Sequence, residues 1–356
     1  MAARSKYKWQ KLPPMPTRRV YSTVIEADGL LFVIGGCDAR GDALDVFECY
    51  IPKKKKWMRL LNIPTKRAAP AVVAIEKQIV VIGGLGGAND PTDAVEVYDI
   101  GKKCWITDKK NMGEELQGVT AVVHRNKPLV VGGMRRDSNP TEKCSVLDLE
   151  ENCWKELPDI LTPRYAASVH LNGDKIYVLI MNAPVHVEFS GGRQGKLPCA
   201  SLEMMDLSVK PSPSWTTLKD IPVAGVFPAF VMTDSKFYVL GGLKKKVIEG
   251  FHDEFQEYDV EKDEWNQLTV LPRGRSDFGA GMIDGKIIIV GGITSMKTPL
   301  TDVAVYEPEE KKWVNQVDIP TARGSGSSYT YQGKLMIVGG FTVSGLSNAV
   351  EMVGPS

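Results

Sequence analysis

Short apolar segments alternate with polar, turn-rich breaks along the whole chain. Between Thr65 and Trp105, for example, apolar stretches occupy residues 71–75, 79–82 and 95–98, and Trp105 marks a fourth. Polar turns separate them, and no segment shows an apolar stripe at helical spacing over a useful length. The pattern predicts four short strands that form an antiparallel meander.

This unit recurs with a period of about 48 residues. Each tryptophan stands 26 or 27 residues ahead of the same position, which holds Gly-Gly in six copies and Ile180-Met181 in the other. The tryptophans are Trp9, Trp57, Trp105, Trp154, Trp215, Trp265 and Trp313. The glycine pairs begin at Gly35, Gly83, Gly132, Gly241, Gly291 and Gly339. An internal repeat of this length indicates an array in which each unit buries its faces against its neighbours.

The second strand of each unit is almost continuously apolar, as expected for a strand that is covered on both faces. A glycine pair directly after it suits a crowded place where two backbones approach closely. Four-stranded units of this size, repeated seven times, can close into a ring of radially packed sheets. We therefore expect an all-β fold, a seven-bladed β-propeller of four-stranded antiparallel blades.

The two ends of the chain complement each other, because it begins within a repeat at Trp9 and ends without the tryptophan that should follow residues 350–353. We expect the strand at residues 8–11 to close the ring as the fourth strand of the last blade. Residues 1–356 then form a single domain. Its expected blades are residues 13–60, 61–108, 109–157, 158–218, 219–268, 269–316, and 317–353 completed by 6–12.

The repeated residues carry a family resemblance over the whole chain. The combination of Gly-Gly, Tyr-Asp and Trp, as in residues 83–84, 98–99 and 105, resembles the kelch repeat. Residues 18–21 and 33–38 are similar to the stand-alone kelch domain-containing protein 8 group. The fourth repeat departs from the pattern, since Ile180-Met181 replaces glycine and Met205 replaces tyrosine. The resemblance implies a six- or seven-bladed propeller that holds a peptide on its loop face.

Composition is consistent with a soluble propeller. Hydrophobic residues make up 43% of the chain, charged residues 24%, and the net charge is only +1. The balance predicts no bulk attraction to nucleic acid or acidic membranes, and no apolar run approaches the roughly 18 residues that cross a bilayer. Residues 1–10 lack the apolar core of a secretion signal, so we expect a cytoplasmic location. The six cysteines have no Cys-x-x-Cys spacing and are interpreted as reduced thiols.

Arginine recurs 16 residues ahead of the glycine position in five repeats, at Arg19, Arg67, Arg164, Arg275 and Arg323, whereas Leu116 and Gly225 interrupt the series. These positions fall in the connections between blades, on the same face as the loops that join second and third strands. Two hypotheses remain open. The guanidinium groups either tie neighbouring blades together through buried hydrogen bonds, or they hold an acidic peptide or a chain terminus.

Further partner-binding candidates lie in the same two classes of loop: Arg135, Arg136, Lys245 and Phe251. The loop at residues 182–201 is ten residues longer than its counterparts, and that at residues 243–254 is two longer. Extra length in such loops is frequent at binding faces. The lysine run at residues 53–56 is expected to be a solvated turn, with a phosphoinositide or nucleic-acid contact as the alternative.

No reacting constellation is visible. The histidines, His124, His170, His186 and His252, lack metal-ligand spacing, and the glycine-rich residues 83–87 precede no helix that could bind phosphate. We therefore expect no enzyme, cofactor or metal. The expected function is a non-catalytic scaffold or adaptor that binds a protein or acidic peptide, with cell division or cytoskeletal organisation as the process that the resemblance suggests. The alternative is a substrate receptor of a ubiquitin ligase. The oligomeric state is left open.

Overall fold

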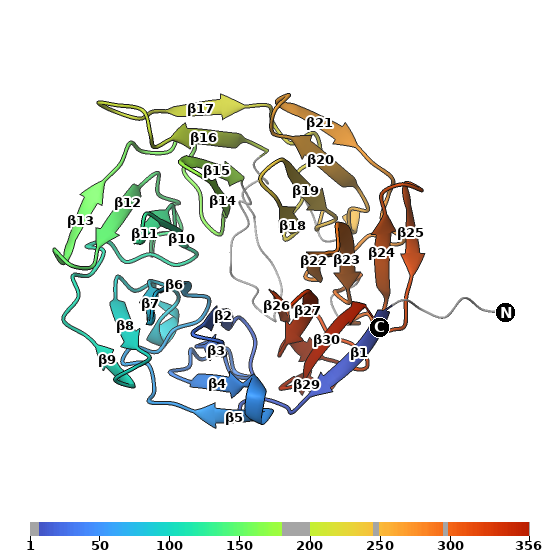
Figure 1. Ribbon diagram of the computed structural model, residues 1–356, viewed down its shortest axis with the longest axis horizontal. Helices are drawn as coiled ribbons and strands as arrows, with labels where there is room; N and C mark the ends of the chain where they lie inside the picture. Colours follow the sequence, from blue (N-terminus) through green and yellow to red (C-terminus); the bar gives the residue numbers. More distant parts are fainter. Residues whose placement is uncertain (1–6, 180–199, 245–248, 295–297, 356) are drawn as a thin grey trace.

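The computed structural model describes residues 7–179, 200–244, 249–294 and 298–355. Over these residues, seven four-stranded antiparallel sheets stand around a common axis, each sheet forming one blade of a ring (Figure 1). The prediction of a seven-bladed all-β propeller is confirmed.

Each blade places its first strand nearest the axis (Figure 1). The first strands are β2 (Thr23–Ala27), β6 (Ala71–Ile75), β10 (Thr120–His124), β14 (Ser168–Asn172), β18 (Ala229–Met232), β22 (Gly279–Ile283) and β26 (Ser327–Tyr331). The second strands are β3 (Leu30–Ile34), β7 (Gln78–Ile82), β11 (Lys127–Val131), β15 (Lys175–Leu179), β19 (Lys236–Leu240), β23 (Lys286–Val290) and β27 (Lys334–Val338).

The third and fourth strands complete the blades toward the outside. The third strands are β4 (Phe47–Ile51), β8 (Val95–Asp99), β12 (Cys144–Asp148), β16 (Leu202–Asp206), β20 (Phe255–Asp259), β24 (Val303–Glu307) and β30 (Val350–Pro355). The fourth strands are β5 (Lys56–Arg59), β9 (Cys104–Ile106), β13 (Cys153–Glu156), β17 (Trp215–Leu218), β21 (Glu264–Gln267), β25 (Lys312–Asn315) and β1 (Tyr7–Leu12). A small hairpin, β28 (Phe341–Thr342) and β29 (Gly345–Leu346), and two 3₁₀-helices, η1 (Pro52–Lys54) and η2 (Gly87–Asn89), lie in connections.

The second strands are buried because each faces two neighbouring blades. In β7, Val80 and Ile82 pack into one apolar core with residues of the next blade. The alternate residues Ile79 and Val81 pack into another core with residues of the preceding blade. Side chains of a strand alternate between faces, so a continuous apolar run fills two inter-blade cores at once.

The ring closes where the two ends of the chain meet. Strand β1 pairs antiparallel with β30, with Trp9 opposite Val353 and Tyr7 opposite Pro355. Tyr7 and Trp9 pack against residues of β23 and β24 in the neighbouring blade. The predicted closure by the N-terminal strand is thereby confirmed.

The glycine pairs allow neighbouring blades to touch through their backbones. Gly35 has φ +61°, and a Cβ atom there would lie 2.2 Å from the carbonyl oxygen of Arg67 in the next blade. The following N–H, of Gly36, donates a hydrogen bond of 3.0 Å to that same oxygen. The corresponding bond from Gly340 to the carbonyl of Arg19, 3.2 Å long, links the last blade to the first. Side chains are therefore excluded at these positions, as the sequence predicted.

Hydrogen bonds from tryptophan side chains connect neighbouring blades at the outer edge of the ring. The indole Nε1 of Trp105 donates at 3.0 Å to the carbonyl of Leu61, in the connection that follows the last strand of the preceding sheet. Trp265 donates to Lys219 in the same way at 2.8 Å. In the described part of the chain, the buried Nε1 of Trp313 has no such partner.

Candidate functional site

We call the side of the ring that carries the connections between blades and the loops between second and third strands the loop face. The hairpin turns of the blades form the opposite side, the turn face. The five repeated arginines enter from the loop face, but their side chains lie inside the protein. None is more than 2% exposed: Arg19, Arg67, Arg164, Arg275 and Arg323.

Arg67 illustrates how such a side chain is held. Its Nη2 donates a hydrogen bond of 2.5 Å to the Oε2 atom of Glu96. Its Nη1 donates to the carbonyls of Gly83 and Ala94, both at 3.1 Å, and its Nε donates to the carbonyl of Thr65 at 3.2 Å. One guanidinium group therefore joins the segment that enters the blade to its second and third strands.

A buried glutamate accompanies the arginine in four blades. It is the second residue of the third strand and forms the ion pairs Arg19–Glu48, Arg67–Glu96, Arg164–Glu203 and Arg323–Glu351. A threonine hydroxyl often completes the group; that of Thr65, for example, donates to the other carboxylate oxygen of Glu96 at 2.6 Å. The sequence analysis missed these glutamates. Their recurrence at one position of the third strand, in repeats that carry the arginine, was the signal that could have found them.

The remaining blades show that the charges come in pairs. Ala304 occupies the glutamate position in the sixth blade, where Arg275 contacts Asp302 instead, at 3.3 Å. The fifth blade has no repeated arginine, and the glutamate position holds Gln256. Its side-chain amide accepts a hydrogen bond from the N–H of Val223 and donates one to the carbonyl of Val223, both 2.8 Å long. A buried carboxylate at this position therefore occurs only where a guanidinium group accompanies it.

The electrostatics of these pairs follow from burial. Burial lowers the pKa of the Arg19 guanidinium to about 10, while the charge of Glu48 acts in the opposite direction. At neutral pH the arginine stays protonated, so the group is an enclosed ion pair. Removing one partner of such a pair leaves an uncompensated buried charge.

The other predicted residues reach solvent to different degrees. Arg136 is exposed and lies 3.3 Å from Glu115 and 3.4 Å from Asp90. Arg135 is partly buried beside Glu114 and donates to the hydroxyl of Thr141 at 2.9 Å. Phe251 is half-buried and bridges to Leu243. Lys245 and residues 182–199 of the long loop lie outside the described residues.

The loop face also has exposed cations that the repeat does not use. Arg18 and Lys66 each directly precede a buried arginine, in the segments that enter the first and second blades. Both are exposed, and neither forms an ion pair with another residue for which the structure gives a position.

Three histidines bond to carboxylates. His124 lies 2.7 Å from Asp174, His170 lies 3.3 Å from Asp234, and His252 lies 2.8 Å from Glu254. Within the described ranges, no three His, Cys, Asp or Glu side chains are grouped so that they could hold a metal ion. His186 lies outside these ranges. The same ranges contain no helix of the length and apolar character that spanning a membrane requires.

Solved structures with the same fold include an enzyme. A fungal alcohol oxidase of the AA5 family, in complex with copper, superposes with a TM-score of 0.74 at 15% identity, covering 98% of this chain and 76% of the oxidase chain. The protein YjhT superposes with a TM-score of 0.59, also at 15% identity, covering 96% of this chain and 97% of the other. The oxidase contradicts the expectation that the chain is not an enzyme. That expectation was wrong because absent motifs do not exclude catalysis on a fold whose sites are built by loops.

Sequence relatives narrow the family. Kelch domain-containing protein 8B from Homo sapiens and from Rattus norvegicus are each 34% identical over 123 residues, which is 31% of this chain and 33% of theirs. The match thus spans about a third of the length of these relatives. Kelch-like protein 15 from Danio rerio is 30% identical over 83 residues, 22% of this chain and 14% of that protein.

The match to a family profile is more extensive. The KLHDC2/KLHL20/DRC7 Kelch-repeats domain matches residues 4–180 and 118–340, and together these segments cover most of the chain. The predicted resemblance to kelch repeats and to the kelch domain-containing protein 8 group is confirmed. Similarity to these kelch proteins supports a role as a protein-interaction scaffold. With its seven blades, glycine pairs and tryptophan rim, this chain belongs to the kelch-repeat family.

Proposed function

We propose that this propeller is a cytoplasmic protein-interaction scaffold whose loop face binds an acidic segment of a partner protein. The observation that carries the proposal is the pair of exposed cations Arg18 and Lys66, which project from neighbouring blades without a carboxylate partner in the described chain. Exposed cations attract carboxylates, and a guanidinium fork can bind a carboxylate through two hydrogen bonds.

Apolar side chains on the same face support binding of a peptide over binding of a small anion. Val343, at the tip of the β28–β29 hairpin, is 80% exposed, and Tyr21 is exposed beside the first strand of the first blade. Protein interfaces combine apolar and aromatic contacts with a charged rim. A segment with acidic and apolar residues would match both features.

The buried arginines receive a different role in this proposal. Arg19, Arg67, Arg164, Arg275 and Arg323 would support the loops from below, because their buried guanidinium groups bond to carboxylates and backbone carbonyls. Arg19 does so through Nη2, while its Nε and Nη1 have no partner among the described residues. Contact with the partner would fall to Arg18, Lys66, Arg135, Arg136 and Phe251.

The test reverses the exposed charges without touching the buried pairs. The double variant Arg18→Glu/Lys66→Glu should lose most of the partner protein captured from a cell extract, measured by quantitative mass spectrometry, and should lose binding of a labelled hexaglutamate peptide. Its melting temperature should match that of the unchanged protein. The matched control is Lys53→Glu/Lys54→Glu, which makes the same charge change on the turn face at η1.

Equal loss in both double variants would indicate general charge attraction and would contradict the proposal, as would full capture by Arg18→Glu/Lys66→Glu. The proteins captured in the same experiment test two finer predictions. Components of the cytoskeleton or division machinery would support that process. A cullin or elongin among them would favour the alternative role as a ubiquitin-ligase substrate receptor.

A further inference from the structure

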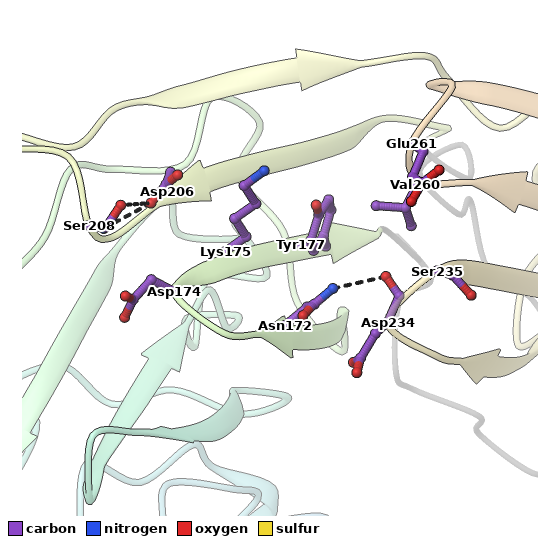
Figure 2. A pocket seen from close by; sticks show the side chains of 10 residues that line it. All are labelled: Asn172, Asp174, Lys175, Tyr177, Asp206, Ser208, Asp234, Ser235, Val260 and Glu261. Atoms are coloured by element: carbon purple, nitrogen blue, oxygen red, sulfur yellow. Dashed lines mark hydrogen bonds between the residues drawn. The ribbon is translucent and has the colours of Figure 1, made fainter.

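A cavity of about 650 Å³ opens on the turn face, between the fourth and fifth blades. Figure 2 shows the side chains that line it, which come from the ends of β14, β15 and β16 on one side and from the turns of the fifth blade on the other. Its size falls within the range of small-ligand pockets, roughly 300–1,000 Å³. It lies on the opposite side of the ring from the loop face.

The cavity is negatively charged. Asp174, Asp206, Asp234 and Glu261 contribute four carboxylates, and Lys175 contributes the single lining ammonium group, so the lining carries a net charge of −3 at neutral pH. The carboxylate of Asp234 is 78% exposed, although one of its oxygens lies 3.3 Å from Nε2 of His170. Glu261 is exposed and forms no ion pair within the described chain. These two groups, both from the fifth blade, remain available to an incoming cation.

A largely buried tyrosine that lines the cavity gives an independent indication of a ligand. Tyr177 is only 4% exposed, its ring packs against Phe237 with centroids 5.1 Å apart, and it lines the cavity (Figure 2). No described residue forms a hydrogen bond with its hydroxyl group. Burial, followed by the charge of Asp206, raises the pKa of Tyr177, so the phenol stays protonated. Polar groups on largely buried side chains usually have a hydrogen-bond partner.

The next blade shows what a structural tyrosine looks like at the same position. Tyr238 is the third residue of β19, as Tyr177 is of β15, and its ring packs against Phe255 on the third strand of its own blade. Glu257 stands directly opposite Tyr238 on the third strand, and burial together with a side-chain hydrogen bond to Glu257 raises the pKa of Tyr238. Opposite Tyr177, the third strand has Met204. The fourth blade therefore lacks the carboxylate that satisfies the hydroxyl in the fifth.

We propose that this cavity is a binding site for an arginine side chain of a basic peptide. The carboxylates of Asp234 and Glu261, which come from different turns of the fifth blade, would attract the guanidinium group, and the Tyr177 hydroxyl would bond to the peptide. Planar guanidinium groups match carboxylates through paired hydrogen bonds and are more weakly hydrated than ammonium groups, so arginine fits a partly enclosed acidic cavity better than lysine. The inference goes beyond the proposed function, since it assigns a second partner chemistry to the opposite side of the ring.

The experiment titrates the full chain with acetyl-triarginine-amide and follows binding by isothermal titration calorimetry. The double variant Asp234→Asn/Glu261→Gln should bind the peptide at least about tenfold more weakly, because both carboxylates lose their charge and charge-assisted hydrogen bonds to the peptide are lost. Tyr177→Phe should weaken binding about three- to tenfold and leave the melting temperature unchanged, since its hydroxyl has no partner to lose. Tyr238→Phe should instead lower the melting temperature and leave binding intact.

The matched charge control is Asp284→Asn/Glu309→Gln, which neutralises exposed residues in the corresponding turns of the sixth blade. It should leave the affinity unchanged. Four results would overturn the proposal: no saturable binding, equal weakening in both double variants, unchanged affinity in Tyr177→Phe, or saturable binding of spermine at this site without binding of the peptide.

Discussion

At the scale of single residues, the protein places full charges in its interior and neutralises each one locally. Arg67 and Glu96 are both buried and share a hydrogen bond of 2.5 Å. The hydroxyl of Thr65 and backbone carbonyls form further hydrogen bonds with the pair. Isolated ions of this kind would be very unfavourable in a protein core, but a saturated pair is tolerated. Buried arginine–glutamate pairs of this kind lie beneath the loop face in four of the seven blades.

The substitution Arg67→Met tests the energetic role of such a pair. It leaves Glu96 buried without its partner, and we expect the free energy of unfolding to fall by about 3–5 kcal/mol. Chemical denaturation with urea measures the loss. The combined variant Arg67→Met/Glu96→Gln should recover part of it, because no unpaired charge remains.

The exposed Arg136 provides the comparison. Arg136→Met should change the free energy of unfolding by less than about 0.5 kcal/mol, as is usual for surface positions. A cost below about 1 kcal/mol for Arg67→Met would contradict the role given to the buried pairs.

At the scale of elements, neighbouring blades are joined by repeated contacts at their rims and hairpin ends. The rim contact is a hydrogen bond from an indole to a carbonyl in the connection that follows the preceding sheet, as in Trp265 to Lys219 at 2.8 Å. Trp313 departs from the series, because its buried Nε1 finds no partner among the residues described. A comparison of Trp265 with Trp313 therefore distinguishes the contribution of the indole hydrogen bond to stability from the contribution of the packing of the indole ring.

We expect Trp265→Phe to destabilise the protein more than Trp313→Phe does, by about 1 kcal/mol. Both substitutions remove similar apolar area, but only the first also breaks a hydrogen bond. Thermal unfolding of the two variants, followed by circular dichroism, gives the comparison. Equal losses would show that the indole bond adds nothing to the joint between blades.

The hairpin ends give the stability a dependence on pH. The Nζ atom of Lys127 and the backbone N–H of Glu151 donate to Asp148 at 2.5 and 3.1 Å, and these bonds hold its pKa well below the usual range. Because the folded-state pKa lies below the unfolded value of about 3.9, the stabilisation is complete above that pH and is lost as the pH falls through the folded-state pKa.

Asp148→Asn should therefore destabilise the protein clearly at pH 7, and the gap to the unchanged protein should narrow as the pH falls below about 4. Urea denaturation at pH 7 and pH 3 measures both gaps. Asp220→Asn, at an exposed position without an ion pair among the described residues, is the control. A gap for Asp148→Asn that does not depend on pH would contradict the role assigned to the carboxylate.

At the scale of the whole molecule, the repeat period was sufficient to predict the ring. Tryptophan and glycine spacing predicted the blades, and the unmatched ends at Trp9 and residues 350–353 predicted the closure. These features are visible in sequence because every blade needs them for the same geometric reason. Each blade packs against two neighbours, so the same packing requirement recurs in every repeat of the sequence.

The site was harder to predict. Arg19 and Arg18 are adjacent and chemically identical, yet one is enclosed and the other is exposed. What separates them is a glutamate 29 residues later in one blade and 39 later in another, since the intervening loops differ in length. The cavity beside Tyr177 needs side chains from two blades, and a single repeat does not contain them. The exclusion of catalysis rested on absent motifs and was wrong for that reason.

Removal of residues 1–12 tests the closure. Without β1, the edge of β30 is unpaired and Tyr7 and Trp9 leave their core. We expect a markedly lower melting temperature and self-association through the free strand edge, measured by calorimetry and size-exclusion chromatography. A circular permutant is the control: it joins Pro355 to Tyr7 through a short turn and opens the chain between Lys54 and Lys55. It should melt close to the unchanged protein, because the register already places Tyr7 opposite Pro355.

The pairing of β1 with β30 also sets the order of events during biosynthesis. The first strand to leave the ribosome belongs to the blade that is finished last, so it must wait for almost the entire chain. At translation rates of roughly 5–20 residues per second, a chain of 356 residues leaves that strand without its partner for about 20–70 s. During this interval the nascent protein exposes an incomplete arc with open strand edges, which are the surfaces that chaperones recognise. The ring can therefore close only after β30 has left the ribosome.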